Sequence, residues 1–230
     1  MRVTVLIAAY NAEASIAEAV ESALSQNPPA GGHEVLVVDD GSTDRTRGVL
    51  ARFGGSLRVL DQPHRGLAAA LNAGLAAAGG EGFLRLDADD TLAPGALQAL
   101  AGGLAATPAA GCAYADRIEV FPDGRTERIS LAAFNVFRTI GCGILFRTGT
   151  ARAIGGYDDL LFEEYDFLIR YLMASPERVY VPEALYRYRR HAAGMTGRPR
   201  YWEEGMAQMR RKWGEAALAR WGYHEVFACA

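Results

Sequence analysis

Short apolar runs alternate with segments of helical periodicity through the first half of the chain. Each apolar run suits a buried strand, and the segment after it repeats apolar residues at helical spacing. The predicted strand and helix pairs cover residues 3–8 and 14–26, 34–38 and 45–53, 57–60 and 67–78, and 83–86 and 94–106. Pro94 suits the first turn of the fourth helix. This alternation is typical of right-handed βαβ units, so we expect an α/β fold with an open, twisted, mostly parallel sheet and flanking helices.

The regular alternation ends near residue 111. Residues 112–120 and 125–129 are predicted to form a hairpin, because Asp123 and Gly124 supply the positive φ of a tight turn. No linker or low-complexity tract interrupts the sequence, so we expect a single domain. The other predicted elements are a strand at 144–147, helices at 148–154 and 163–173, short strands at 179–181 and 185–188 around Pro182, and a C-terminal helix at 201–221.

The composition excludes several classes of protein. The chain has 230 residues, half of them apolar, with a net charge of −3 and a single lysine, Lys212. The arginines are spread along the sequence, which argues against nucleic-acid binding. Cys112, Cys142 and Cys229 have no metal-binding or disulfide spacing, and no apolar stretch approaches the roughly 20 residues of a membrane span. We therefore expect a cytoplasmic protein.

Acidic residues follow two of the predicted strands. Asp39 and Asp40 open the sequence DDGSTD at 39–44, and DADD occupies 87–90. Because the carboxyl ends of parallel strands meet at one sheet edge, the two groups should approach each other and need a cation or another partner. Residues 42–44 could instead cap the next helix, and 87–90 could be a solvated loop.

The chemistry of these acidic residues favours a hard divalent cation. Carboxylate oxygens with no nearby His or Cys suit Mg²⁺ or Mn²⁺, which bridge protein carboxylates to a diphosphate. The first strand is followed by AAYNAE at 8–13, and this is neither of the glycine-rich loops that bind phosphate. A metal ion would therefore have to hold the phosphates.

Six motifs occur in an order that resembles a family 2 glycosyltransferase of the GT-A fold. They are VLIAAYN at 5–11, VVDDGSTD at 37–44, LDADD at 86–90, GGYD at 155–158, EEYD at 163–166 with Arg170, and YRYRRH at 186–191. The resemblance implies a metal-dependent, inverting transfer of a sugar from UDP or dTDP to a hydroxyl of a glycan or a lipid-linked acceptor, in surface polysaccharide or glycoconjugate synthesis. It also divides the domain into a nucleotide-binding half (1–110), an acceptor-binding half (111–200) and a C-terminal helix (201–230).

The resemblance assigns the nucleotide contacts residue by residue. Ala8 and Tyr10 would border the nucleoside, and Asp40, acting alone or together with Asp39, would accept the N3 hydrogen of uracil or thymine. The family often has Ala-Arg-Asn in its third helix, where this chain has ALN at 70–72. Asn72 matches the asparagine of that triplet and is expected to contact the nucleotide. Leu71 stands where the family has arginine, and Arg65 is the candidate to replace that arginine contact.

The resemblance also places the diphosphate and its metal. Asp87, Ala88, Asp89 and Asp90 correspond to the DxD motif, with one aspartate more than the motif requires. Asp89 is the first candidate for the metal ligand and Asp87 is expected nearer the ribose, while Asp87 and Asp90 remain alternative metal ligands. His191 would lie close to the diphosphate and neutralise its departing charge.

Glu164 is the candidate general base. In the family a Glu-Asp pair opens this helix and its second member is the base, whereas here the pair is Glu163 and Glu164. A position at a helix N-terminus should favour the ionised carboxylate. The alternatives are that Glu164 is a surface residue or that Asp166, one turn on, is the base.

Three other features have structural interpretations that compete with functional ones. Cys142 reads as a small packing residue, and Arg187 and Arg190 as members of surface ion pairs. The C-terminal helix carries an apolar face at spacings of four and three, which predicts packing across the domain or, as the alternative, a peripheral contact with the inner face of the membrane or with a second copy.

Two other functions remain as alternatives to sugar transfer. A sugar nucleotidyltransferase would need a glycine- and arginine-rich loop with a nearby lysine, and the chain has only Lys212. A catalytically silent nucleotide-sugar sensor or accessory subunit would bind the nucleotide sugar but would have Glu164, the candidate general base, far from the metal site.

Overall fold

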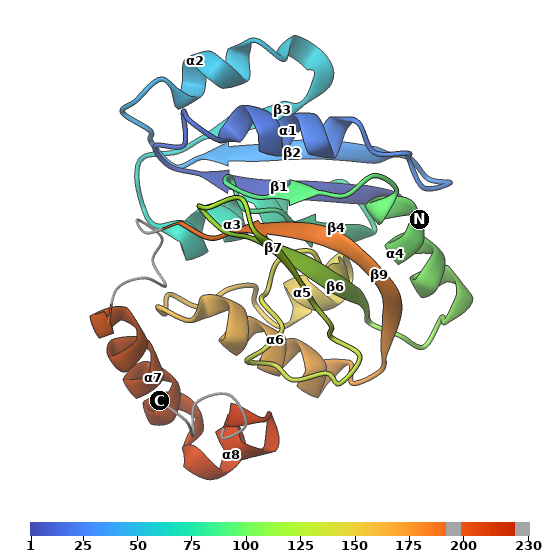
Figure 1. Cartoon of the computed structure of the whole chain (residues 1–230), viewed down its shortest axis with the longest axis vertical. Coiled ribbons are helices and arrows are strands. Elements are labelled where there is room, and N and C mark those ends of the chain that lie inside the picture. The colour runs from blue at the N-terminus through green and yellow to red at the C-terminus, as the bar shows by residue number, and fades with distance from the viewer. Residues whose placement is uncertain (192–198, 224–230) are drawn as a thin grey trace.

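The first half of the chain forms the parallel part of one large sheet, as its alternating pattern predicts (Figure 1). The structure is a computed structural model that describes residues 1–191 and 199–223. The elements of this half are β1 (Val3–Ala9), α1 (Ile16–Leu24), β2 (His33–Asp39), α2 (Thr46–Ala51), a 3₁₀ turn (Gly54–Ser56), β3 (Arg58–Asp61), α3 (Leu67–Ala77), β4 (Gly82–Arg85), β5 (Thr91–Leu92) and α4 (Ala96–Ala106).

The second half adds strands of both directions to the same sheet. Its elements are β6 (Cys112–Val120), β7 (Thr126–Ile129), β8 (Leu145–Arg147), α5 (Thr148–Ala153), α6 (Glu163–Ala174), β9 (Arg178–Arg189), α7 (Pro199–Trp213) and α8 (Glu215–Arg220). The strand order is β3-β2-β1-β4-β8-β6-β9-β5, with β7 paired to β6. Strands β1 to β4 are parallel, whereas β8 runs antiparallel to both β4 and β6. This arrangement confirms the predicted hairpin, and Gly124 at its turn has φ +83°.

Both faces of the sheet are covered, which explains the continuous apolar sequence of β1. Val5 and Ile7 point to a core cluster that includes residues of α1 and α4, while Leu6 points to a cluster with α3 and α6. Side chains alternate across a strand, so a strand covered on both faces is mostly apolar, and the one polar side chain of β1, Thr4, is buried and hydrogen-bonded to Glu34. The apolar face of α7 belongs to the second cluster, with Met206 and Met209 buried, and this confirms the predicted packing of that helix across the domain.

Three details of the predicted elements are wrong. Pro94 precedes the fourth helix, because Gly95 takes the N-cap position with φ +81°. The two short strands around Pro182 are one strand, β9, because the pairing with β6 passes over Pro182 as an irregularity in register. The C-terminal helix is broken into α7 and α8 at Gly214, where φ is +74° and the backbone leaves the helical region.

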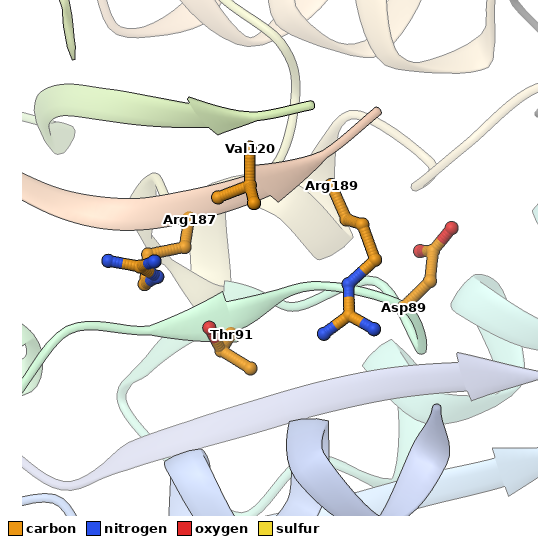
Figure 2. A pocket seen from close by; sticks show the side chains of 5 residues that line it. All are labelled: Asp89, Thr91, Val120, Arg187 and Arg189. Atoms are coloured by element: carbon orange, nitrogen blue, oxygen red, sulfur yellow. The ribbon is translucent and has the colours of Figure 1, made fainter. Parts of the chain in front are cut away.

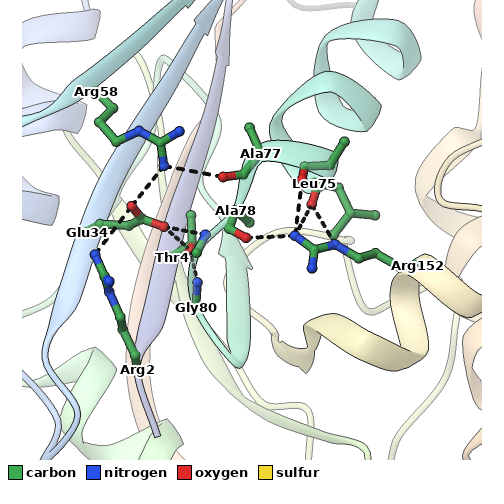
Figure 3. Close-up of polar contacts among 11 residues, drawn as sticks. Arg2, Thr4, Glu34, Arg58, Leu75, Ala77, Ala78, Gly80 and Arg152 are labelled. Carbon is green, nitrogen blue, oxygen red and sulfur yellow. Dashed lines mark hydrogen bonds and ion pairs between the residues drawn. The ribbon is translucent and has the colours of Figure 1, made fainter.

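A network of charges joins the strands at the edge where β1 and β2 begin (Figure 3). Glu34 accepts hydrogen bonds from Thr4 (2.7 Å) and Arg58 (3.1 Å) and lies 3.5 Å from an Arg2 guanidinium nitrogen. The Thr4 hydroxyl in turn accepts the backbone N–H of Gly80 (2.9 Å). These contacts fix the edge opposite the acidic loops.

Arg152 of α5 closes the C-terminal end of α3. Its guanidinium donates to the carbonyls of Leu75 (2.9 Å), Ala76 (3.2 Å) and Ala78 (2.6 Å), which have no partners within the helix (Figure 3). We expect Arg152→Ala to lower the free energy of unfolding by about 1.5–3 kcal/mol, as for hydrogen bonds with a charged donor. Urea unfolding measures this loss.

Arg47→Ala is the matched control for that measurement. Arg47 makes an exposed ion pair with Asp61, and its removal should leave the free energy of unfolding nearly unchanged. Equal stability losses in both variants would contradict the capping role of Arg152.

Candidate active site

The loops that follow β1 and β2 are joined to each other. Asn11, in the left-handed conformation with φ +50°, accepts the backbone N–H of Thr43 (2.8 Å) and donates its own backbone N–H to Ser42 Oγ (3.0 Å). Asp44 accepts the backbone N–H of Thr46 (2.9 Å) at the first residue of α2. Arg45 takes the N-cap position of α2 without a side-chain cap, so none of residues 42–44 is the N-cap, although Asp44 satisfies the first backbone N–H of the helix.

Asp40 is buried and fully engaged within the protein. Its carboxylate accepts hydrogen bonds from the side chains of Gln62 (2.6 Å) and His64 (2.8 Å) and from the backbone N–H groups of Arg65 and Gly66 (both 2.9 Å). Burial raises the pKa of Asp40, but the hydrogen bonds outweigh it and hold the pKa below its ordinary value. A carboxylate has about four acceptor positions. Asp40 therefore anchors residues 62–66 and has no acceptor position left for a base.

Asp39 differs from its neighbour. Its Oδ1 accepts the backbone N–H of Ser42 (3.0 Å), while Oδ2 has no hydrogen-bond partner among residues 1–191 and 199–223. Next to it, the exposed ring of Tyr10 stacks on His64 with 3.9 Å between ring centroids. Arg65 is exposed and is held only through its backbone. Tyr10 and Arg65 thus present exposed side chains to a ligand, whereas Asp39 is 3% exposed and offers one carboxylate oxygen that has no partner in the described residues.

Asn72 has a structural position. Its amide donates to the Tyr157 carbonyl (2.7 Å) and accepts the Tyr157 N–H (2.8 Å). A Cβ on Gly156 would lie 2.2 Å from Asn72 Oδ1, so this glycine permits the close approach. Because both ends of the amide are engaged, Asn72 joins α3 to the 155–157 loop and has no free group for a nucleotide. Ala8 is partly buried near the end of β1.

Asp87 is held by a buried arginine that the sequence did not single out. Arg85, the last residue of β4, donates from Nε to Asp87 Oδ1 (2.7 Å) and from a terminal nitrogen to Oδ2 (3.3 Å). The Cys142 thiol donates to the same Oδ2 (3.0 Å). Burial raises the pKa of Cys142 well above its ordinary value, which supports its interpretation as a packing residue. The sequence did contain a signal for Arg85, because it is the single charged residue in an otherwise apolar predicted strand and a buried charge needs a partner.

Asp89 and His191 meet, although 102 positions separate them in the sequence. His191 Nε2 lies 2.7 Å from Asp89 Oδ2, and both side chains are about 41% exposed. Asp89 also borders a small pocket between β5 and β9, which Figure 2 shows with Arg187 and Arg189 beside it. Ala88 lies partly exposed before Asp89.

The arginines near the end of β9 differ in their partners. Arg190 forms an ion pair with Glu119 (2.8 Å), as its surface interpretation predicts, and Arg189 pairs with Glu18. Arg187 has no ion pair with any residue of the described chain and lines the pocket beside Asp89.

Asp90 is not suited to bind a metal. It is 2% exposed, and its carboxyl accepts hydrogen bonds from the Tyr186 hydroxyl (2.6 Å) and the Arg189 backbone N–H (2.7 Å). Burial, together with the charges of Asp87 and Asp89, raises the pKa of Asp90 well above its ordinary value. In this structure Asp90 joins the DADD loop to β9, and its carboxylate is far less accessible than that of Asp89.

The remaining donors fit a divalent cation that is shared with a ligand. No group of three or more His, Cys, Asp or Glu side chains in the described residues is arranged to hold a metal by itself. Mg²⁺ and Mn²⁺ are commonly bound by one or two carboxylates, with waters and phosphate oxygens completing the shell. Asp89 supplies an accessible hard oxygen of this kind, and Asp87 lies two residues before it.

Glu163 and Glu164 open α6 with very different surroundings. Glu163 is buried and accepts a hydrogen bond from Arg85 (3.0 Å). Glu164 is partly exposed, lies against Gly141, and has no ion pair or hydrogen bond with any other residue that the structure describes. Loss of hydration and then the charge of Glu163 raise the pKa of Glu164 well above its ordinary value. The helix N-terminus favours the carboxylate, but the pKa of Glu164 is raised because burial and the neighbouring charge of Glu163 act in the other direction.

Asp166, the competing base, is unavailable. Its carboxylate is fully buried and bound by Arg170 (2.8 Å), Lys212 (2.6 Å) and the Trp213 indole N–H (2.9 Å). Two cations and an indole fill its acceptor positions. Asp166 instead attaches α7 to α6, and Glu164 is the free carboxylate of this helix start.

The comparison with known families agrees with this geometry. The profile described as "Glycosyl transferase family 2" matches residues 4–155. The chain belongs to glycosyl transferase family 2. Among relatives of this glycosyltransferase, the succinoglycan biosynthesis protein ExoO of Rhizobium meliloti is 39% identical over 132 residues, which is 55% of this chain and 36% of ExoO. The chondroitin synthase of Pasteurella multocida is 34% identical over 125 residues, 53% of this chain and 13% of the synthase.

Solved structures show that the glycosyltransferase has the GT-A fold in a single domain. S. aureus TarS 1-349 in complex with UDP-GlcNAc superimposes with a TM-score of 0.74 at 21% identity, over 86% of this chain and 61% of TarS 1-349. The mannosyltransferase PcManGT from Pyrobaculum calidifontis, in complex with GDP-Man and Mn²⁺, gives a TM-score of 0.68 at 21% identity, over 91% and 64%. The glycosyltransferase thus spans less than two thirds of each of these proteins. Over residues 1–191 and 199–223, no helix has the length and apolar character needed to cross a membrane.

Proposed function

We propose that the chain transfers a sugar from a nucleoside diphosphate to a hydroxyl of a glycan or a lipid-linked acceptor, with inversion at the anomeric carbon. The observation that carries this proposal is the free, partly exposed carboxylate of Glu164, which Arg85 links through Glu163 and Asp87 to the DADD loop. The names of the relatives, a chondroitin synthase and a succinoglycan biosynthesis protein, support a role in polysaccharide or glycoconjugate synthesis.

The nucleoside would lie against Tyr10 and Ala8 at the ends of β1 and β2. Asp39, with its free Oδ2, would accept the N3 hydrogen of uracil or thymine, while Asp40 would support the site by holding the 62–66 loop. Arg65 has an exposed side chain in that loop that could contact the nucleotide. TarS 1-349 with UDP supports a uridine donor, although a second relative of the same fold binds GDP-Man.

Asp89 would hold Mn²⁺ or Mg²⁺ against the diphosphate, with Asp87 and His191 beside it. When bound, such an ion neutralises the charge that develops on a diphosphate leaving group. The Asp89 carboxylate supplies the hard oxygen, and a ring N–H of His191 would donate to a phosphate oxygen. Arg187 beside the same pocket adds positive charge.

Glu164 would accept the proton of the acceptor hydroxyl as that oxygen attacks the anomeric carbon. Its raised pKa suits a general base, because a carboxylate of higher pKa is a stronger proton acceptor near neutral pH. The bond to the diphosphate breaks on the opposite face, which gives inversion.

Replacements of the two aspartates at the end of β2 should have different effects. Asp39→Asn should weaken UDP binding by about 1–3 kcal/mol, because an amide replaces the carboxylate oxygen that accepts the N3 hydrogen of the base. The same replacement should leave the free energy of unfolding nearly unchanged. Asp40→Asn should instead lower the free energy of unfolding by roughly 1–3 kcal/mol. Because its pKa is lowered by folding, the stability from Asp40 is present above its ordinary pKa and is lost as pH falls through the lowered value.

Calorimetric titration with UDP and urea unfolding of both variants measure these effects. Asn11→Ala, which removes another side chain joining these loops, controls for general loosening of the region. Weaker UDP binding in Asp40→Asn with unchanged affinity in Asp39→Asn would reverse the assignment.

A panel of nucleotides and nucleotide sugars tests the donor class. Thermal unfolding is followed with UDP, dTDP, CDP, GDP and ADP and with their sugar derivatives, each with Mn²⁺ and with EDTA. We expect the nucleotides with an N3–H pyrimidine to stabilise the protein most. Equal stabilisation by GDP or ADP would contradict the assignment of the base site.

A further inference from the structure

Three segments far apart in the sequence meet around the guanidinium of Arg85. Arg85 is 4% exposed, and its nitrogens contact Asp87 of the DADD loop (2.7 and 3.3 Å) and Glu163 of α6 (3.0 Å). The Arg85 carbonyl also accepts the backbone N–H of Gly143 (3.0 Å). The Arg85 side chain thereby joins the donor-side loop to the start of α6, and its backbone carbonyl holds the 141–143 loop at the same place.

The 141–143 loop reinforces the same junction. Cys142 donates its thiol to Asp87 (3.0 Å), and Gly141 lies so close to α6 that an added Cβ would come within 2.5 Å of Glu164 Cβ. The position of Glu164 is therefore fixed on one side by this loop and on the other by its neighbour Glu163, which Arg85 holds.

The chemistry at this position requires an arginine. Asp87 and Glu163 are both ion-paired with Arg85, and no other cation pairs with either of them in the described residues. A guanidinium presents several N–H groups in a rigid plane and can bind two carboxylates in fixed directions, whereas an ammonium is a point charge on a flexible stem. Without this partner the buried carboxylate of Glu163 would be strongly destabilising, while Asp87, 29% exposed, would lose the contacts that orient it.

We propose that Arg85 is a positioning residue that sets the placement of the general base Glu164 relative to the donor-side loop. It touches neither the donor nor the acceptor, and it acts through Glu163 on one side and Asp87 on the other. Loss of the two ion pairs of the Arg85 guanidinium should therefore lower kcat more than it lowers the affinity for the donor. This inference rests on the proposed function, because it assumes that Glu164 and the DADD loop act in one reaction.

The test compares Arg85→Lys with Arg152→Lys in the full chain. The Arg152 guanidinium also makes several hydrogen bonds, but in the described residues its partners are carbonyls at the end of α3. The same replacement there controls for the general effect of exchanging a guanidinium for an ammonium. The readouts are kcat for sugar release from a UDP-sugar, UDP affinity by calorimetry, and the midpoint of thermal unfolding. We expect Arg85→Lys to lower kcat by about 10- to 100-fold, as for a displacement of about 1 Å in a reacting group, with UDP affinity changed much less.

Glu163→Gln provides a second variant in case Arg85→Lys does not fold. The amide oxygen can still accept from Arg85, but the ionic part of the link to α6 is lost while Asp87 keeps its partner. Its kcat should fall by about 10-fold with UDP affinity retained.

The outcomes separate this inference from the proposed function. A wild-type protein that turns over no nucleotide sugar would overturn the proposed function and the inference with it. An active wild type with kcat unchanged in Arg85→Lys, or in Glu163→Gln where Arg85→Lys is unfolded, would overturn the inference alone. A loss of UDP affinity as large as the loss in kcat would likewise overturn it, since Arg85 would then act only on the donor side.

Discussion

Replacing Glu164 by Gln should lower turnover by roughly 10²- to 10⁴-fold and leave UDP affinity nearly unchanged. Glutamine keeps the shape and the hydrogen-bonding reach of the side chain but cannot take a proton. Because Glu164 makes no ion pair that stabilises the described fold, its replacement should cost little stability. Initial rates of UDP release, UDP calorimetry and thermal unfolding on the same preparation measure the three quantities.

The pH dependence of kcat/KM is an independent test of Glu164 as the general base. The base acts as a carboxylate, so kcat/KM should fall as pH drops through the pKa of Glu164. Since burial and Glu163 raise that pKa, this loss should occur at a higher pH than for an ordinary glutamate. In Glu164→Gln the acidic limb assigned to this group should be absent from the remaining activity.

Asp166→Asn is the matched control within the same helix. Asp166 is bound by Arg170, Lys212 and Trp213, so its replacement should reduce stability and spare the kcat of the folded protein. Loss of turnover in Asp166→Asn, with full turnover in Glu164→Gln, would show that the base has been assigned to the wrong turn of α6.

The second large effect should come from metal linkage at Asp89. At a UDP concentration of 100 times its Kd with Mn²⁺, the nucleotide should stabilise the protein by about 2.7 kcal/mol, and much less in EDTA. Asp89→Asn should abolish the difference between the two conditions, because it removes the accessible anionic oxygen of the loop. UDP titrations followed by thermal unfolding, with Mn²⁺ or EDTA, measure this linkage.

Asp159→Asn serves as the control for a lost exposed carboxylate, since Asp159 lies in the turn before α6. It should keep the full effect of Mn²⁺ on UDP binding. Equal UDP affinity in Mn²⁺ and EDTA for the wild type would contradict the metal-linked account, whatever the variants show.

The parallel half of the fold could be predicted because its signals are local. The runs at β1, β2 and β4 are mostly apolar, and a helical pattern follows each of them, so neither strand identity nor direction needed tertiary information. The hairpin at Gly124 was equally local. The bulge at Pro182 and the break at Gly214 depend on the register with β6 and on packing against α6, which no short window of sequence contains.

The sequence predicted which residues belong to the candidate site better than it predicted the hydrogen-bond and ion-pair partners of each residue. The resemblance singled out Asp89, His191 and Glu164, and the structure brings Asp89 and His191 together. Whether a carboxylate is free or engaged depends on chain segments distant in sequence, so Asp40 looked as available as Asp39. The same limit hid Arg85, whose partner Glu163 lies 78 residues away.

Turnover of a UDP-sugar is the most direct test of the account. The purified chain is incubated with UDP-sugars and Mn²⁺, with and without short glycan acceptors, and UDP release is followed beside the anomeric configuration of any product by NMR. We predict slow hydrolysis without acceptor, faster release with a suitable one, an inverted product, and loss of both activities in Glu164→Gln. Metal-dependent UDP-sugar binding with no release under any condition would contradict the account and would identify a silent nucleotide-sugar sensor or accessory subunit.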